Sequence, residues 1–518
     1  MEVIAAAAAY ALNNWSPQKA LAKLGLASLI ASNVNFTADL GPTLSTKASV
    51  VLRSDANFVD LTSRWREWHA PDIAAVVQVA TEGDVQQTVR YANEHGIPFI
   101  ARSGGHGATE AMASAKNAIQ IDFRKLNQVK VSEDGKTATI GGGANVKEVV
   151  QTLMESGKQT GELTGIRPAN IQRLTVLVTG ICECVGISAP ILGGGHGWLQ
   201  GQYGLLADQV VSARLVLPSG DAVTVSGDSN PDLFWAIRGA GHNFGLVTEW
   251  EYRIHDIKHP EWSYETFVFS GDKLEALYDL TNEMMKNQPP EVIHWGYMLK
   301  IAEIDPDHPI IWYAMIYDGP ISKAQEYAKP IHNIGPMITN AGEATIPELA
   351  AITFMSEDGA SCAKGLTTHR YPIGLKSYNT AAVRKVYDEI DSTLQREPEL
   401  ARSVFLLEGY STQGVQAMDE KSTAFPHRGD EVLVTSYVQY TPNATLDPIA
   451  QEFGKKLQKY LLDGSDDPER LRAYVNYANG DESLQEVYGW EEWRLEKLRD
   501  LKAEWDPENR MRYYMPIV

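Results

Sequence analysis

Apolar residues recur at alternating helical and strand spacings between residues 72 and 257. Asp84 is suited to cap a helix in which Val85 and Val89 lie on one face, and Gly96 is suited to end it. Segments with strand spacing precede and follow such helical stretches. This region is therefore predicted to mix helices and strands within one folding unit.

Two dipeptides in the same region favour tight hairpin turns, because their residues tolerate the backbone angles that such turns require. The predicted turns are Asp134-Gly135, between strands at 129–131 and 137–140, and Ser219-Gly220, between strands at 210–217 and 222–225. Hairpins beside helices are typical of an α+β domain, which is the fold class that we predict.

Residues 258–446 have a different pattern. Strand-like runs at 310–317 and 432–440 alternate with helical stretches near 322–333 and 378–394. This pattern indicates a broad sheet covered by helices and marks the region as a candidate substrate domain.

The boundaries divide the chain into four parts: an N-terminal extension at 1–71, the mixed region at 72–257, the candidate substrate domain at 258–446 and a C-terminal segment at 447–518. That last segment is expected to end in a charged helix from Trp490 to Glu504, stopped by Asp506-Pro507.

Composition narrows the classes of partner. The chain has 518 residues and a formal net charge of −20, so its surface repels phosphate backbones and nucleic acid is not an expected partner. No apolar run reaches the roughly 20 residues needed to span a bilayer. Residues 1–12 contain an alanine run but no basic region, so they make a poor signal peptide. We expect a soluble protein and slightly favour the cytoplasm, although the compartment stays open.

The three cysteines are Cys182, Cys184 and Cys362. They are too few for a disulfide framework, and the single residue between the first two makes a bond between them improbable. We therefore expect disulfides to contribute little to stability. Cys182 and Cys184 lack a second pair of soft ligands, so no metal site is predicted.

Two glycine-rich loops carry the candidate chemistry. The first spans residues 102–107 and directly follows a strand predicted at 97–101; the second spans 182–197. Glycines let the backbone approach a ligand closely and expose N–H groups to a pyrophosphate. The alternatives are a tight turn with an exposed histidine and a loop with small buried cysteines. Gln200 stands where a nicotinamide dinucleotide motif needs Gly or Ala, so that cofactor is unsupported.

Together with later motifs, these loops resemble the berberine-bridge-enzyme-like FAD-linked oxidases of the vanillyl-alcohol-oxidase superfamily. The later motifs are 232–239 with 243–245, Phe425-Pro426-His427-Arg428, Tyr474-Val475-Asn476-Tyr477 and Asp506-Pro507-Glu508-Asn509. The resemblance runs from about Pro71 to the C-terminus. It implies a two-domain, PCMH-type FAD-binding fold, in which a substrate domain with a broad antiparallel sheet covers the flavin and the C-terminal segment completes the FAD domain.

The resemblance also implies how FAD is held. His106 stands where the family bonds a methyl group of the flavin ring, and Cys182 stands where bicovalent members bond a neighbouring ring carbon. Members with only the histidyl bond exist, so the second bond stays open. Val185 matches a position that influences oxygen access, and valine there favours an oxidase. The other residues expected at the cofactor are Arg102, Ser103, Gly104, Gly105, Gly107, Gly186, Gly193, Gly194, Gly195, Gly197 and Asn476.

The catalytic base is less well defined. Tyr477 matches a family tyrosine that serves as base, and its alternative role is packing against the flavin. The glutamate base of plant members is absent, because Leu433 or Val434 occupies its position; Glu431 lies close enough in the strand to be a second candidate. Pro190 replaces a histidine that supports the flavin in plant members.

These residues predict an FAD-dependent oxidase that transfers hydride from a small specialised metabolite to covalently bound flavin, with molecular oxygen reduced to hydrogen peroxide. The alternatives are a carbohydrate oxidase, an FAD-scaffolded cyclase without net redox chemistry, and a noncatalytic binding module. Neither the substrate nor the oligomeric state follows from the motifs.

Overall fold

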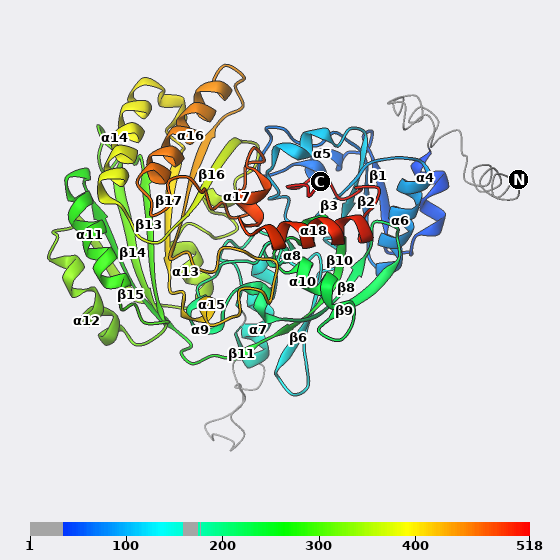
Figure 1. Ribbon diagram of the computed structural model, residues 1–518, viewed down its shortest axis with the longest axis horizontal. Helices are drawn as coiled ribbons and strands as arrows, with labels where there is room; N and C mark the ends of the chain where they lie inside the picture. The colour runs from blue at the N-terminus through cyan, green and yellow to red at the C-terminus, as the bar shows by residue number, and fades with distance from the viewer. Residues whose placement is uncertain (1–34, 159–174, 177) are drawn as a thin grey trace, which may run out of the picture.

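The computed structural model describes residues 35–158, 175–176 and 178–518 of the chain. The described chain forms two halves, with a seven-stranded sheet on one side and a four-stranded and a five-stranded sheet on the other (Figure 1); a further sheet has only two short strands. The α+β fold class and the division into two sheet-containing parts are confirmed.

A four-stranded sheet begins the smaller half. Its strand order is β1 (Ser49–Leu52), β2 (Ile73–Gln78), β4 (Ala118–Asp122) and β3 (Phe99–Arg102). Helix α6 (Glu82–Glu94) lies where the apolar spacing predicts it. Its N-cap is Thr81, however, and Asp84 completes a capping box three residues further on. Asp84 therefore takes part in capping the helix, as predicted, but from the N3 position and not from the N-cap position.

A five-stranded antiparallel sheet follows. Its order is β5 (Val129–Val131), β6 (Thr137–Gly141), β10 (Leu246–Arg253), β8 (Val210–Val216) and β9 (Ala222–Ser226). Both predicted hairpins are present, since β5 pairs with β6 and β8 pairs with β9. The main helices of this part are α7 (Val146–Lys158) and α10 (Pro231–Ile237).

The larger half contains a seven-stranded antiparallel sheet. Its order is β15 (Ile338–Ala344), β12 (Trp262–Phe269), β14 (Ile310–Tyr317), β13 (Val292–Leu299), β17 (Val404–Tyr410), β18 (Val432–Tyr440) and β16 (Thr367–Leu375). Helices cover its outer face (Figure 1): α11 (Leu274–Met285), α12 (Ile321–His332), α14 (Thr380–Arg396) and α16 (Asp447–Asp463). The predicted broad sheet covered by helices is confirmed.

The C-terminal segment contacts both halves. Helix α16 buries Phe453 and Leu457 and packs on β16 and β18, so the start of this segment belongs with the large sheet. Helix α18 (Glu492–Trp505) packs instead on α10 of the smaller half. Its buried Lys502 donates a hydrogen bond to the carbonyl oxygen of Asn243 and pairs with Asp506.

Short helices and strands connect these layers: α4 (Phe36–Asp39), α5 (Phe58–Thr62), β7 (Thr175–Val176), α8 (Ser188–Leu192), α9 (Gln200–Tyr203), β11 (His255–Asp256), α13 (Ile346–Ile352), α15 (Gln413–Gln416) and α17 (Leu484–Tyr488). None of the helices in the described ranges is both long and apolar enough to cross a membrane.

Candidate active site

A cavity of about 670 Å³ lies where the two halves of the molecule meet. One wall comes from the glycine-rich loops and the C-terminal segment, and the other from strands of the seven-stranded sheet. The residues predicted from sequence that line it are Arg102, Ser103, Gly104, Gly105, His106, Gly107, Cys182, Val185, Gly186, Asn476 and Tyr477. Those that do not line it are Gly193, Gly194, Gly195, Gly197 and Glu431.

The two glycine-rich loops are packed directly against each other. A Cβ atom added at Gly104 would lie 2.3 Å from the Cys184 carbonyl oxygen, and one at Gly186 would lie 2.4 Å from Ser103 Oγ. Such distances are far below van der Waals contact, so both positions require glycine. The close approach brings His106 of the first loop and Cys182 of the second to the same cavity.

The glycines at 193–195 and 197 have a different role from the predicted one. A Cβ atom added to them would lie 2.1–2.6 Å from protein atoms, which are Asn476 Oδ1 for Gly193, Phe425 Cδ2 for Gly194, Leu206 Cβ for Gly195 and the Thr179 carbonyl oxygen for Gly197. Their small size therefore allows close packing within the protein, which a glycine-rich motif does not distinguish from contact with a cofactor.

His106 is held as a neutral imidazole. Burial lowers the pKa of His106 to about 3, and the positive charges of Arg370, Lys364 and Arg102 act in the same direction. Its ring stacks on Trp65, with centroids 5.6 Å apart and an interplanar angle of 22°. A neutral ring keeps one nitrogen lone pair available for bonding to an electrophile.

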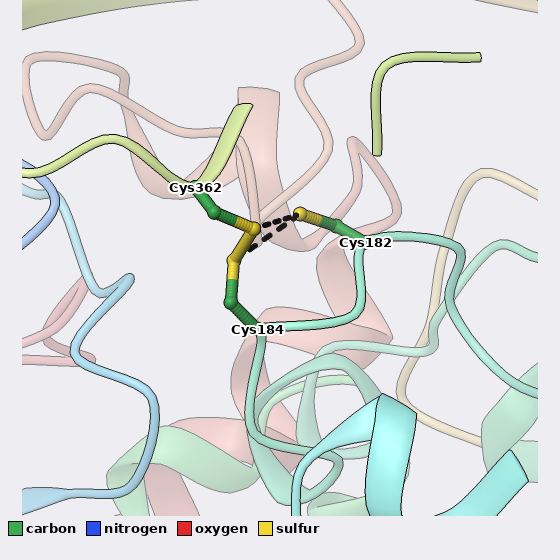
Figure 2. A group of neighbouring side chains, drawn as sticks. All are labelled: Cys182, Cys184 and Cys362. Atoms are coloured by element: carbon green, nitrogen blue, oxygen red, sulfur yellow. Dashed lines mark hydrogen bonds between the residues drawn. A yellow bond between two sulfur atoms is a disulfide. The ribbon is translucent and has the colours of Figure 1, made fainter. Parts of the chain in front are cut away.

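The cysteines correct one expectation from the sequence. A disulfide joins Cys184 to Cys362 across 178 residues of sequence, and it connects the second glycine-rich loop to the segment between α13 and β16 (Figure 2). The spacing of the cysteines does not reveal this bond, because nothing in the local sequence brings Cys362 near Cys184. Cys182 is the free thiol. Burial raises the pKa of that thiol to about 12.

A carboxyl group that the sequence did not single out lies beside Tyr477. The hydroxyl of Tyr477 donates a hydrogen bond to Glu408 Oε1 at 3.3 Å, and the hydroxyl of Tyr410 donates to the same oxygen at 2.8 Å. All three residues line the cavity. Burial raises the pKa of Glu408 to about 8, although both hydroxyl hydrogen bonds oppose that rise. Burial and then the Glu408 charge raise the pKa of Tyr477 well above its usual range.

Glu408 replaces Glu431 as the carboxyl group of the site. Glu431 accepts hydrogen bonds from Thr412 and Gln416 and, like Leu433, lies outside the cavity. Glu408 lies in β17, whose other residues include Phe405, Leu406 and Leu407. One carboxylate in an otherwise apolar strand is a sequence signal that could have identified it, because burying a lone charge is costly.

Asn476 has a structural role at the edge of the cavity. Its Nδ2 donates hydrogen bonds to the Tyr474 hydroxyl at 2.7 Å and to the Pro190 carbonyl oxygen at 3.1 Å. Its Oδ1 lies 3.0 Å from Nε2 of His242. This side chain therefore fixes the turn that carries Tyr477 against the second glycine-rich loop.

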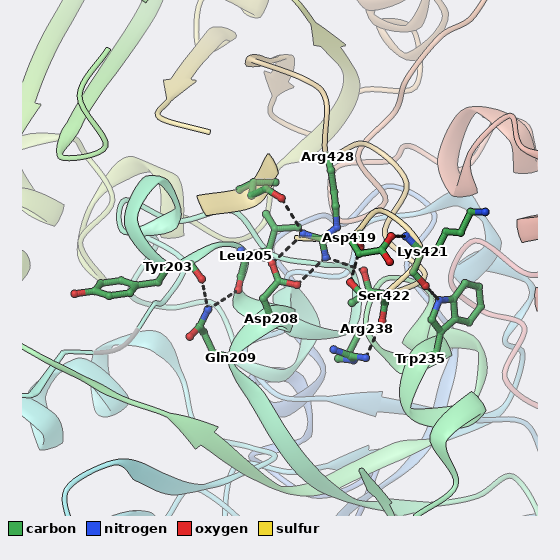
Figure 3. Close-up of polar contacts among 12 residues, drawn as sticks. Tyr203, Leu205, Asp208, Gln209, Trp235, Arg238, Asp419, Lys421, Ser422 and Arg428 are labelled. Atoms are coloured by element: carbon green, nitrogen blue, oxygen red, sulfur yellow. Dashed lines mark hydrogen bonds and ion pairs between the residues drawn. The ribbon is translucent and has the colours of Figure 1, made fainter. Parts of the chain in front are cut away.

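The Phe425–Arg428 motif is architectural. Arg428 and Asp208 form a buried bidentate ion pair, with N–O distances of 2.7 and 3.0 Å (Figure 3). The same carboxylate accepts a hydrogen bond from the backbone N–H of Leu205. Arg238 and Trp235 donate to backbone carbonyl oxygens just before this motif. These contacts join the loop after the second glycine run to the segment entering β18.

Aromatic and apolar side chains from the large sheet and its connections form the wall opposite the glycine loops. They are Trp295, Tyr297, Leu299, Phe354, Met355, Tyr410 and Tyr437. On this wall, the buried Glu408 Oε2 and Trp295 Nε1 have no hydrogen-bond partner among the described residues; elsewhere in the lining the same holds for Nε of Arg64, Arg102 and Arg370. Since such atoms are normally paired, they are available to a bound molecule.

Two family models match the chain. One, described as an FAD binding domain, covers residues 73–226, and the other, described as berberine and berberine-like, covers residues 473–517. Among the curated relatives, the FAD-linked oxidoreductase anuG of Penicillium roqueforti (strain FM164) is 38% identical over 491 residues, covering 94% of this chain and 92% of the relative. The chain belongs to the berberine-bridge-enzyme-like family of FAD-linked oxidoreductases.

Other relatives agree with this assignment. The FAD-linked oxidoreductase chyH of Penicillium rubens is 38% identical over 485 residues, covering 93% of each chain. Physcomitrella patens BBE-like 1 shares the fold with a TM-score of 0.79 and 20% identity, over 94% of this chain and all of the other. Glucooligosaccharide oxidase from Acremonium strictum has a TM-score of 0.77 and 18% identity, over 94% and 100%; that enzyme has a 6-S-cysteinyl, 8α-N1-histidyl FAD.

The cofactor of this family member is FAD, and the cavity fits it. The two glycine-rich loops form one wall of the cavity, and His106 and Cys182, one from each loop, are part of its lining. Arg102 lies beside them, paired with Asp122 through Nη1, while its buried Nε has no hydrogen-bond partner within the described structure. A cationic donor, a neutral histidine and a free thiol together suit an anionic cofactor with an electrophilic ring.

Proposed function

We propose that this oxidoreductase is an oxidase that carries FAD bonded to His106 and Cys182, and that it oxidises a small, largely apolar metabolite. The supporting observation is that His106 and Cys182 share one cavity with the hydrogen-bonded pair Tyr477 and Glu408. When bound, FAD supplies the acceptor for a substrate hydride and passes the electrons to oxygen, giving hydrogen peroxide.

Two features support the bonds to FAD. The neutral ring of His106 has a lone pair to offer, and Trp65 stacks on it and limits its rotation. Cys182 is the cysteine outside the disulfide, so its sulfur is free to react. The relevant nucleophile is the thiolate, and burial in this structure opposes its formation. Bond formation at Cys182 therefore requires the electrophilic cofactor to be in place.

Tyr477 and Glu408 are proposed to move the substrate proton. A substrate hydroxyl or amine hydrogen-bonded to the Tyr477 oxygen can transfer its proton there as hydride leaves the adjacent carbon. Ionised Glu408 accepts the tyrosine hydrogen, so the pair can take up the proton without leaving an isolated phenolate in a buried site. Tyr410 holds the carboxylate in position through its own hydrogen bond.

The wall opposite the glycine loops supports a metabolite with apolar and aromatic surface. Trp295 and Tyr297 present rings to the cavity, and Glu408 Oε2 and Trp295 Nε1 are available to orient a polar group. The homologous fungal proteins are named FAD-linked oxidoreductases without a substrate. A carbohydrate oxidase is the second candidate, because chitooligosaccharide and xylooligosaccharide oxidases share the fold and aromatic walls also bind sugars.

Val185 lines the cavity, and we propose that it leaves oxygen access open. We also propose that residues 72–257 and the end of the chain hold FAD, while residues 258–446 bind substrate.

The Cys184–Cys362 disulfide bears on where the protein resides. Such a bond favours an oxidising compartment over the cytoplasm, which the sequence slightly favoured. Fractionation of the producing organism tests this last proposal.

Anaerobic mixing with candidate substrates tests the proposed reaction. The flavin absorbance should bleach with a substrate and return when oxygen is admitted, with one hydrogen peroxide formed per turnover. Metabolites with aromatic surface and simple oligosaccharides should be screened side by side. A product formed while the flavin stays fully oxidised without oxygen would refute the oxidase and favour the non-redox cyclase.

A further inference from the structure

The three cysteines form one cluster beside the cofactor wall. Cys182 Sγ lies 3.6 Å from the Sγ atoms of both Cys184 and Cys362, as Figure 2 shows. Nε2 of His106 lies 3.2 Å from Cys184 Sγ. The thiol assigned to flavin is therefore also within reach of a cysteine from the other domain.

The segment that carries Cys362 forms part of the cavity. It lies between α13 and β16, and Phe354, Met355 and Ser361 from this segment line the cavity. Backbone hydrogen bonds already hold it close to the second glycine-rich loop, because the Glu183 N–H donates to the Met355 carbonyl oxygen at 3.0 Å. Cys362 would thus stay near Cys182 even without the disulfide.

We propose that the Cys184–Cys362 disulfide protects Cys182: by occupying Cys362, Cys184 keeps the flavin-linking thiol from being captured in a disulfide of its own. This inference rests on the cysteinyl bond of the proposed function. It assigns a purpose to a cysteine that lies at the cofactor wall but does not bond the cofactor.

The competing reactions balance without any unnamed partner. When Cys184 is absent, the thiols of Cys182 and Cys362 can form a disulfide by exchange with a small disulfide such as oxidised glutathione, which leaves as two thiols. When Cys184 is present, attack of the Cys182 thiolate on Cys362 Sγ would break the Cys184–Cys362 bond and release the Cys184 thiolate, with no net redox change. Bonding of Cys182 to flavin removes the attacking thiol and so prevents this exchange.

Peptide mapping without reduction, on purified holoenzymes, tests the proposal with three variants. Cys184→Ser should contain a Cys182–Cys362 disulfide and flavin bonded only to His106. Cys362→Ser is the matched control and should keep the cysteinyl bond, because the remaining Cys184 is only two residues from Cys182 and a disulfide between them is improbable. The double variant Cys184→Ser with Cys362→Ser should regain the cysteinyl bond that the single Cys184→Ser variant has lost.

The results separate this proposal from the proposed function. In denatured, unreduced wild-type enzyme, titration should find no free thiol. One thiol, mapped to Cys182, would refute the cysteinyl bond and with it both statements, whereas two thiols with flavin on Cys182 would refute only the protective disulfide. A Cys184→Ser enzyme that keeps the cysteinyl bond, or a double variant that fails to regain it, would also overturn the proposal.

Discussion

Replacing Glu408 with glutamine should change how the stability of the protein depends on pH. Burial raises the pKa of this carboxyl group from 4.5 to about 8 in the folded protein. Because the folded state binds the proton more tightly than the unfolded chain, Glu408 contributes stability that is complete below pH 4.5 and is lost as pH rises toward 8. Glutamine has no proton to lose, so the variant should not show this loss.

The size of the effect follows from the same shift. Each pKa unit corresponds to about 1.4 kcal/mol. Between pH 4.5 and pH 8, the free energy of unfolding of wild type should therefore fall further than that of Glu408→Gln, by on the order of 5 kcal/mol at most. Above pH 8 the difference should level off. Activity should respond to the same ionisation. In wild type, kcat/KM should rise with pH near pH 8 as Glu408 ionises, and this rise should be absent in the variant because glutamine cannot ionise.

Thermal and denaturant unfolding of both enzymes, measured from pH 5 to pH 9, is the assay. Glu431→Gln is a matched control, because this carboxylate accepts hydrogen bonds outside the cavity. Parallel stability curves for wild type and Glu408→Gln over the whole range would refute the raised pKa. An unchanged pH profile of kcat/KM would refute the role of Glu408 beside Tyr477.

Other variants test separate parts of the site. Tyr477→Phe should lower the rate of flavin reduction by roughly 10²–10⁴-fold, measured by anaerobic stopped flow, while flavin content stays unchanged; a normal rate would leave Tyr477 with only a packing role. Asp208→Asn should destabilise the protein by about 3–5 kcal/mol, because it leaves the buried Arg428 unpaired; a neutral effect in denaturant titration would contradict this. Gly104→Ala should reduce flavin incorporation, since the added methyl group collides with the Cys184 carbonyl oxygen; full incorporation, read from the absorbance ratio at the flavin and protein bands, would contradict the interlocked loops.

Local sequence patterns predicted the fold well where spacing alone decides structure. The strands at 310–317 and 432–440 occur with those bounds, because runs rich in β-branched, aromatic and other apolar residues suit a largely buried sheet. The hairpin at Asp134-Gly135 follows from turn chemistry. The position of α16 on the large sheet was not predicted, because the helical spacing does not say which apolar surface the helix meets, although only residues 441–446 separate it from β18.

The site was predictable only in part for a similar reason. His106, Cys182 and Tyr477 belong to motifs, and the structure brings them to one cavity. Glu408 joins them through strand pairing, and Cys362 joins Cys184 across 178 residues, so neither neighbour is visible in local sequence. A glycine permits close approach of any atom, which is why the motif did not reveal that the glycines at 193–197 pack against protein.

Covalent attachment of FAD is the most direct test of the account. Wild-type protein should be denatured in acid and separated from small molecules, and its absorbance spectrum, intact mass and flavin-containing peptides should then be measured. The account predicts that the yellow colour and the mass of one FAD stay with the chain, on peptides that contain His106 and Cys182. A colourless chain of unmodified mass, with FAD in the soluble fraction, would contradict it.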